Sequence, residues 1–117
     1  MPKKSLESLT EPMFYVLMAF RSGPKCGIEI AGLVEKQTEG RVKIGPATLY
    51  TVLGKFLDVD YLEEIDKDQP GRKRTYTLTG KGLKAYSDEI KRLRYCLHDA
   101  KIVEQEKAKE YEEKRNS

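Results

Sequence analysis

The first long apolar segment of the chain is "MFYVLMAF", residues 13–20, in which no position is charged. Because apolar side chains occupy every side of this segment, it predicts a helix that is buried on more than one face. Thr10 suits the N-cap of the helix, and Pro12 suits its first turn. One face can cover the core of its own domain, so the other needs a second cover, such as a partner subunit.

A second helix is predicted over roughly residues 27–37, between the helix-breaking stretch "RSGPKCG" and Gly40. The spacing of its apolar residues gives one inward side, formed by Ile30, Ala31, Leu33 and Val34. The following "RVKI", residues 41–44, alternates between polar and apolar positions, and it predicts a short strand at most.

The segment "IGPATLYTVLGKFLD", residues 44–58, predicts a third helix, with Pro46 in its first turn. One side is an apolar stripe, formed by Leu49, Val52, Leu53, Phe56 and Leu57. The opposite side is nearly uncharged, because Lys55 is the only charged residue from 45 to 57 in a chain that is 35% charged. A helix that merely faces water should carry more charge, so this side should press against another molecule.

Two strand-like segments follow, "YLEEID" at residues 61–66 and "RTYTLT" at residues 74–79. The stretch between them contains Pro70 and Gly71, which favour a turn. These features predict a β-hairpin with a basic tip.

The last element is predicted to be a helix from near Thr79, a suitable N-cap, to about residue 110. Its apolar positions are spaced 3, 4, 3, 4, 3 and form a heptad seam of Leu83, Tyr86, Ile90, Leu93, Leu97 and Ala100. The seam fails at Glu104 and Lys107, so the charged end is expected to be solvated and frayed. No other helix of the chain matches this one in length, so the seam predicts a homodimer.

Three helices followed by a hairpin define the fold class as α+β, mainly helical, with a winged helix-turn-helix. We expect this domain at residues 1–79 and a C-terminal dimerisation helix at residues 80–117. A helix-turn-helix places its second helix in the major groove of DNA. The nearly uncharged side of the third helix then has an explanation, since small residues allow close approach and hydroxyls reach bases or phosphates. The residues expected to contact DNA there are Ala47, Thr48, Tyr50, Thr51 and Lys55.

The hairpin tip carries three consecutive cations, Arg72, Lys73 and Arg74, which suit contacts to DNA phosphates or to the minor groove. The simpler interpretation is a solvated loop. For the third helix, the simpler interpretation is a half-buried helix in a larger assembly, with Tyr50 as a packing residue.

Composition restricts the function further. A chain of 117 residues forms one domain, and its net charge of +3 permits a polyanion partner without requiring one. The longest apolar run is too short to cross a membrane and no secretory segment is present, so a cytoplasmic location without membrane contact is expected. The two cysteines lie far apart and His98 is the only histidine, so no metal and no cofactor are expected. Phosphate-binding and nucleophile motifs of enzymes are missing, which favours a protein that is not an enzyme.

Three segments together resemble the PadR family of bacterial transcriptional regulators: "LTEPMFYVLMAF", "GRVKIGPATLYTVLGKFL" and "GRKRTYTLTGKG". The resemblance covers about residues 8–100 and is closest to the short subgroup with a single C-terminal helix. Two positions depart from the family pattern. "PKCG" stands where a His-Gly-Tyr-Gly type turn is common, and Asp60 replaces the usual glycine before the first wing strand. Asp tolerates a left-handed conformation, so this turn should persist.

The resemblance implies a dimer in which each C-terminal helix packs on the first helix of the other subunit. It also implies binding to a two-fold operator in double-stranded DNA, usually as a repressor that a small apolar or aromatic effector releases. By the same resemblance, an effector pocket would be faced by Phe14, Met18, Leu93 and Leu97. A closed hydrophobic dimer core is the alternative, because spacing alone does not distinguish a seam from a cavity.

Two other functions are compatible with these patterns. The winged helix can be a protein-interaction module, or the dimer can bind a small molecule without specific contact to DNA. Intact "GPATLY" and "GRKR" segments count against the second of these alternatives.

Overall fold

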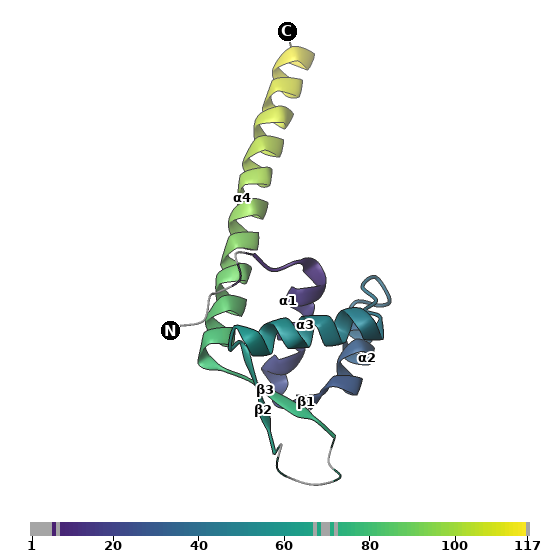
Figure 1. Ribbon diagram of the computed structural model, residues 1–117. Helices are drawn as coiled ribbons and strands as arrows, with labels where there is room; N and C mark the ends of the chain where they lie inside the picture. Colours follow the sequence, from purple (N-terminus) through teal and green to yellow (C-terminus); the bar gives the residue numbers. More distant parts are fainter. Residues whose placement is uncertain (1–5, 7, 67, 69–70, 72, 117) are drawn as a thin grey trace. The chain divides into compact units, whose positions relative to one another are not determined.

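The computed structural model describes residues 6, 8–66, 68, 71 and 73–116 (Figure 1). The chain divides into two compact units, residues 1–87 and residues 88–117. The elements follow in the order α1, a short 3₁₀ helix at Phe20–Ser22, β1, α2, α3, β2, β3 and α4. This arrangement confirms the predicted winged helix-turn-helix with a long C-terminal helix.

Helix α1, Glu11–Ala19, begins where the sequence predicts. The hydroxyl of Thr10 accepts a hydrogen bond from the N–H of Met13 at 3.3 Å, which satisfies one of the otherwise unpaired donors at the helix start. Val16 and Leu17 are completely buried, and Phe14 and Met18 are half-buried. The completely buried residues therefore belong to one face of α1, whereas Phe14 and Met18 on the other side are only half-buried, so burial on more than one face is present only in part within the first unit.

Helix α2, Gly27–Gln37, has the predicted bounds, and Ile30 and Val34 are completely buried. The prediction that Leu33 points inward is wrong, because Leu33 is 39% exposed. Consecutive residues of a helix are about 100° apart, so Leu33 lies beside the narrow stripe that Ile30 and Val34 form.

The segment 41–44 is not a strand, so the prediction of a short strand there is wrong. The N–H of Val42 donates to the hydroxyl of Thr38 at 3.0 Å, and that hydroxyl also bonds the carbonyl oxygen of Val34. The backbone donor at Val42 is thus satisfied by a nearby side chain rather than by a neighbouring strand. Val42 and Ile44 are buried and hold this connection against the core.

Helix α3, Pro46–Asp58, buries the predicted stripe at Leu49, Val52, Leu53 and Phe56, and Leu57 is half-buried. The turn that follows places Asp60 at φ 61°, so the expected left-handed conformation at this position is confirmed. The N–H of Tyr61 then donates to the carbonyl oxygen of Phe56 at 2.8 Å, which closes the end of the helix.

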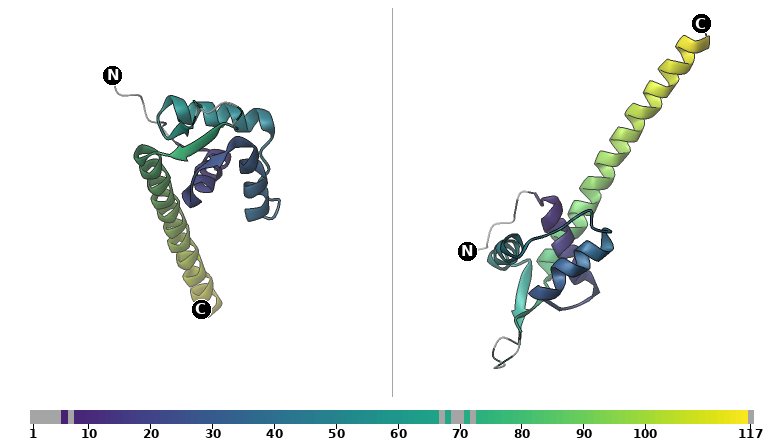
Figure 2. Two further views of the ribbon diagram at one scale, coloured as in Figure 1. Left: turned by 90° about the horizontal axis from the view of Figure 1, so that it is seen from below. Right: turned by 90° about the vertical axis from the view of Figure 1, so that its right-hand side faces the viewer.

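The sheet has three antiparallel strands in the order β1-β3-β2. Strands β2, Leu62–Ile65, and β3, Thr75–Leu78, form the predicted hairpin. Strand β1, Lys25–Cys26, lies within the stretch that was interpreted only as a helix break, and it pairs with Tyr76 and Thr75 of β3. Figure 2 shows the hairpin extending beyond helices α1, α2 and α3, which gives the first unit a wing.

Helix α4, Gly80–Asn116, begins after Thr79, whose hydroxyl accepts a hydrogen bond from the N–H of Gly82 at 3.0 Å. The predicted N-cap is therefore confirmed. The helix continues beyond the predicted end near residue 110, so the charged end that was expected to fray is helical. Its Ala, Glu, Lys and Gln residues are strong helix formers, and Lys107 pairs with Glu110 at 3.5 Å.

The start of α4 lies very close to the turn after α3. A Cβ atom at Gly82 would lie only 2.1 Å from the carbonyl oxygen of Tyr61, so this position requires glycine. The hydroxyl of Thr79 donates to the carbonyl oxygen of Asp60, and the N–H of Thr79 donates to that of Tyr61 at 3.1 Å. These contacts join the turn after α3, the end of β3 and the first turn of α4.

Candidate nucleic-acid interface

The outer face of α3 carries the five residues that the sequence predicts as DNA contacts. All of them are exposed: Ala47, Thr48, Tyr50, Thr51 and Lys55. Ala47, Thr51 and Lys55 lie away from the stripe that anchors α3 in the core, and Thr48 and Tyr50 lie at its edges, because successive residues of a helix are about 100° apart. The face is therefore rigidly supported and nearly uncharged, and two hydroxyls, a phenol and an ammonium are its polar groups.

A shallow groove of about 320 Å³ lies along this face. One wall is the exposed side of α3 from Ala47 to Lys55, and the other is the start of α1 with Thr10 and Pro12. The groove has small residues along its length, which allows an extended partner to approach the backbone of α3.

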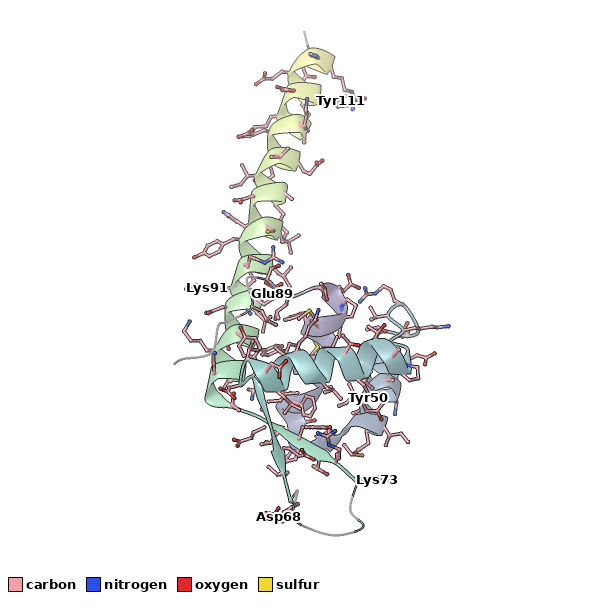
Figure 3. All side chains as sticks on the ribbon, viewed as in Figure 1. Tyr50, Asp68, Lys73, Glu89, Lys91 and Tyr111 are labelled. Atoms are coloured by element: carbon pink, nitrogen blue, oxygen red, sulfur yellow. The ribbon has the colours of Figure 1, made fainter. Side chains whose placement is uncertain are left out.

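A second depression, of about 290 Å³, joins α3 to the wing. Tyr50 of α3, Lys73 and Arg74 line it together with the start of α2 at Gly27 and Ile28. Figure 3 labels Tyr50 and Lys73, and it shows them on α3 and at the wing. The structure thus brings together predicted residues of the helix and of the wing on one surface. Arg72 lies outside the described residues.

Arg74 is held by two neighbours within the sheet. Its Nε and Nη2 atoms donate to the two carboxylate oxygens of Glu64 at 2.9 and 3.1 Å, and its guanidinium lies 5.6 Å from the centre of the Tyr76 ring. The hydrogen bond to Glu64 raises the pKa of Arg74 above its ordinary value. Sequence reasoning placed Arg74 in a cationic run and missed this pairing, since Glu64 is ten residues away on the neighbouring strand.

Cys26 is the N-cap of α2, a role that the sequence interpretation did not assign. The Glu29 carboxylate accepts hydrogen bonds from the backbone N–H and the thiol of Cys26, at 3.1 and 2.9 Å. The hydrogen bond from the thiol raises the pKa of Cys26 and lowers the pKa of Glu29. The spacing Cys-x-x-Glu matches a capping box in which Cys replaces Ser or Thr, and this signal could have identified the cap.

The predicted effector-pocket residues lie in both units. In the first unit, Phe14 stacks on Tyr86 with ring centres 5.4 Å apart, so a predicted pocket residue and a predicted seam residue contact each other within one chain. Met18 accepts a hydrogen bond on its sulfur from the Gln37 amide at 3.2 Å. In the second unit, Leu93 is 41% and Leu97 is 57% exposed.

The other predicted seam residues have different exposures. Leu83 and Ala100 are exposed, and Ile90 is half-buried. In the second unit, Arg92 donates two hydrogen bonds to Glu89, at 2.6 and 2.9 Å, and these lower the pKa of the Glu89 carboxyl. An ion pair at this spacing supports the helix beside the apolar positions.

Two kinds of feature are absent from the part of the chain that the structure describes. Within that part, no three His, Cys, Asp or Glu side chains gather as a metal site would require. None of its helices combines the length and the apolar character that a membrane span needs.

The fold and this surface define a class of protein. A helix-turn-helix pair with an exposed, low-charge second helix, followed by a basic wing, is typical of winged-helix transcriptional regulators. The model of the PadR-like family of transcriptional regulators matches residues 16–88. The chain belongs to this family, whose members are transcription regulators and not enzymes.

Solved structures share the fold. A transcriptional regulator from Clostridium thermocellum has a TM-score of 0.67 at 19% identity, over 80% of this chain and 89% of that chain. A PadR-like transcription factor from Bacteroides fragilis has a TM-score of 0.62 at 20% identity, over 79% and 88%. Bacillus subtilis PadR, solved in complex with operator DNA, has a TM-score of 0.61 at 20% identity, over 69% of this chain and 47% of that chain. No curated protein sequence matches the chain.

Proposed function

We propose that the protein is a homodimeric regulator of transcription that binds a specific operator in double-stranded DNA. The observation that carries the proposal is the second depression, where Tyr50 of α3 and Lys73 and Arg74 of the wing line one surface. A recognition helix and a wing must face the same side if both are to contact one duplex. The operator complex of Bacillus subtilis PadR supports the same use of the fold.

In this proposal α3 enters the major groove. Ala47 allows the helix backbone to approach the base edges, and the hydroxyls of Thr48 and Thr51 bond bases or phosphates. Tyr50 and Lys55 reach the phosphate backbone at the sides of the groove. The wing cations contact phosphates, which adds affinity without sequence information.

The proposed dimer uses the exposed heptad seam of α4. Leu83, Leu93 and Leu97 are the large apolar seam residues that are exposed on a single chain, and a second copy of the helix would cover them. A two-fold dimer requires an operator with two half-sites about one helical turn apart.

We extend the proposal to regulation by a ligand. By family resemblance, the protein acts as a repressor, and a small apolar or aromatic effector releases it from DNA. The residues assigned to effector binding by that resemblance are Phe14, Met18, Leu93 and Leu97. Saturable binding of an apolar aromatic dye, with loss of DNA affinity as the site fills, is the expected result. A dye that binds without changing DNA affinity would contradict the regulatory part of the proposal.

The decisive experiment for DNA binding is a salt titration with two labelled duplexes. One duplex is taken from the region upstream of the protein's own gene, and the other has the same composition in scrambled order. We expect tighter binding to the upstream duplex and a steep decrease of affinity with salt, because phosphate contacts release counterions. Binding to neither duplex at low salt would reject the proposal in favour of a protein-interaction module. Equal binding to both would reject specificity for this upstream site.

A further inference from the structure

Arg74 is the one described wing cation whose orientation the fold fixes from two sides. The Glu64 carboxylate holds it through Nε and Nη2, and the Tyr76 ring lies beneath the guanidinium. Glu64 and Tyr76 are register partners on β2 and β3, so the sheet itself sets the separation of these two neighbours. The Tyr76 ring is almost completely buried and provides a fixed surface.

The hydrogen bonds to Glu64 use only one edge of the guanidinium. An arginine side chain has five N–H donors, and Glu64 accepts one from Nε and one from Nη2. Both N–H groups of Nη1 and the second of Nη2 remain, and together they form the end of the planar fork. The Arg74 side chain is 66% exposed, and it lines the same depression as Tyr50 and Lys73.

We infer that Glu64 is a positioning residue for DNA binding: it holds Arg74 so that the end of its guanidinium binds one backbone phosphate with two parallel hydrogen bonds. The inference rests on the proposed function and adds a residue that does not contact DNA. A mobile arginine must lose side-chain freedom when it binds a phosphate, and the contact with Glu64 removes that freedom in advance. The phosphate and the carboxylate then occupy different edges of the same fork.

An opposite role for Glu64 has a distinct signature. If the carboxylate imitated a phosphate and competed for Arg74, its removal would increase the affinity for DNA. Removal of any carboxylate near the wing also weakens the general repulsion of DNA, so a charge-matched control is essential. Glu63 provides it, because Glu63 is the adjacent residue of β2, is exposed, and points to the opposite face of the sheet.

The test measures dissociation constants of the full chain for the upstream and scrambled duplexes in a double-mutant cycle. Its variants are Glu63→Gln, Glu64→Gln, Arg74→Ala, and each Gln variant combined with Arg74→Ala. We expect Glu64→Gln to bind roughly 3- to 10-fold more weakly than Glu63→Gln on both duplexes, because a phosphate contact is independent of sequence. In the Arg74→Ala background the two Gln variants should bind equally. Arg74→Ala should also reduce the salt slope by about 1.

Several outcomes would overturn the inference. Tighter binding by Glu64→Gln than by Glu63→Gln would show competition instead of positioning. If Glu64→Gln still binds DNA more weakly than Glu63→Gln in the Arg74→Ala background, Glu64 acts on the fold and not through Arg74. The thermal unfolding of the two Gln variants tests this separately, because equal melting temperatures exclude an effect on the fold. If Arg74→Ala binds DNA as tightly as the unmodified protein, Arg74 does not contact a phosphate. If the unmodified protein binds DNA and the cycle shows no coupling, only this inference fails, whereas absence of binding to both duplexes rejects the proposed function as well.

Discussion

At the scale of single residues, close backbone contacts and polar pairs decide which substitutions the protein tolerates. Gly82 has no room for a side chain, because its Cβ position is occupied by the backbone of Tyr61. Gly80, two residues earlier, has no heavy atom within 4 Å of its Cβ position. The two glycines of "TGKG" therefore differ in their structural roles although they are similar in the sequence.

This difference predicts the outcome of two matched substitutions. Gly82→Ala should lower the free energy of unfolding by about 2 kcal/mol or more, because the turn after α3 must move to admit the methyl group. Gly80→Ala should change stability by less than about 1 kcal/mol, because alanine is a better helix former and meets no obstacle. Urea unfolding followed by circular dichroism measures both. Equal destabilisation by the two substitutions would contradict the close contact at Tyr61.

Cys26 provides a second prediction at this scale. The Glu29 carboxylate raises the pKa of the Cys26 thiol, so less of the reactive thiolate is present at neutral pH. In a Cys96→Ser background, Glu29→Gln should therefore speed the alkylation of Cys26 by iodoacetamide at pH 7.5. Mass spectrometry of the modified chain measures the rate. The same rate with Glu and Gln would show that the thiol does not donate to residue 29 in solution.

The same pair gives stability a pH dependence of defined sign. The pKa of Glu29 is lowered in the folded chain, so its contribution is present above the ordinary value of about 4.5 and is lost as pH falls through the lowered value. Acid titration of the melting temperature should accordingly show a smaller decrease below pH 4.5 for Glu29→Gln than for the unmodified protein. Parallel decreases in the two proteins would rule out this contribution.

At the scale of secondary-structure elements, the sequence pattern predicted the features that are determined by residues close together in the chain. The bounds of α2, the buried stripe of α3 and the hairpin are confirmed because spacing, caps and turn residues act within a few positions. Strand β1 was missed since it exists only through pairing with Tyr76 and Thr75, about fifty residues later. The Arg74–Glu64 pair was missed for the same reason, because the register of β2 and β3 is needed to find it.

The seam of α4 leads to a prediction about assembly. Leu93→Glu should convert the proposed dimer to a monomer, because a carboxylate in an apolar seam carries a large desolvation cost. Tyr95→Glu is the control, since Tyr95 is also exposed but lies about 200° around the helix from Leu93. Sedimentation velocity measures the mass of both. A dimer that survives Leu93→Glu, or one that Tyr95→Glu disrupts, would mean that another face of α4 forms the interface.

At the scale of the whole molecule, the two units carry different parts of the proposed function. The predicted DNA contacts lie in the first unit, whereas Leu93, Leu97 and Ala100 of the seam lie in the second. The low net charge of +3 did not reveal a DNA-binding protein by itself. The order of the elements and the position of the basic residues at the wing indicated DNA binding, and the family match agrees.

Residues 104–117 should be dispensable for this function. Their removal deletes five acidic and four basic residues, so the net charge changes from +3 to +4 and the salt dependence should hardly change. The seam ends at Ala100, so the shortened chain should remain a dimer with an affinity for the upstream duplex within about 3-fold of the full chain. Fluorescence anisotropy and sedimentation measure the two properties. A large loss of affinity would assign a DNA contact to the charged end.

The close contacts of Tyr61, Thr79 and Gly82 couple the position of α3 to that of the first turn of α4. Backbone touches backbone at this point, without a flexible side chain between, so the first turn of α4 and the C-terminal end of α3 move together. In the proposed dimer, a reorientation of the first turn of α4 would therefore also reorient α3 in each subunit. If the two α3 helices of the proposed dimer no longer matched successive major grooves, affinity for the proposed operator would fall without any change at the predicted DNA-contacting side chains.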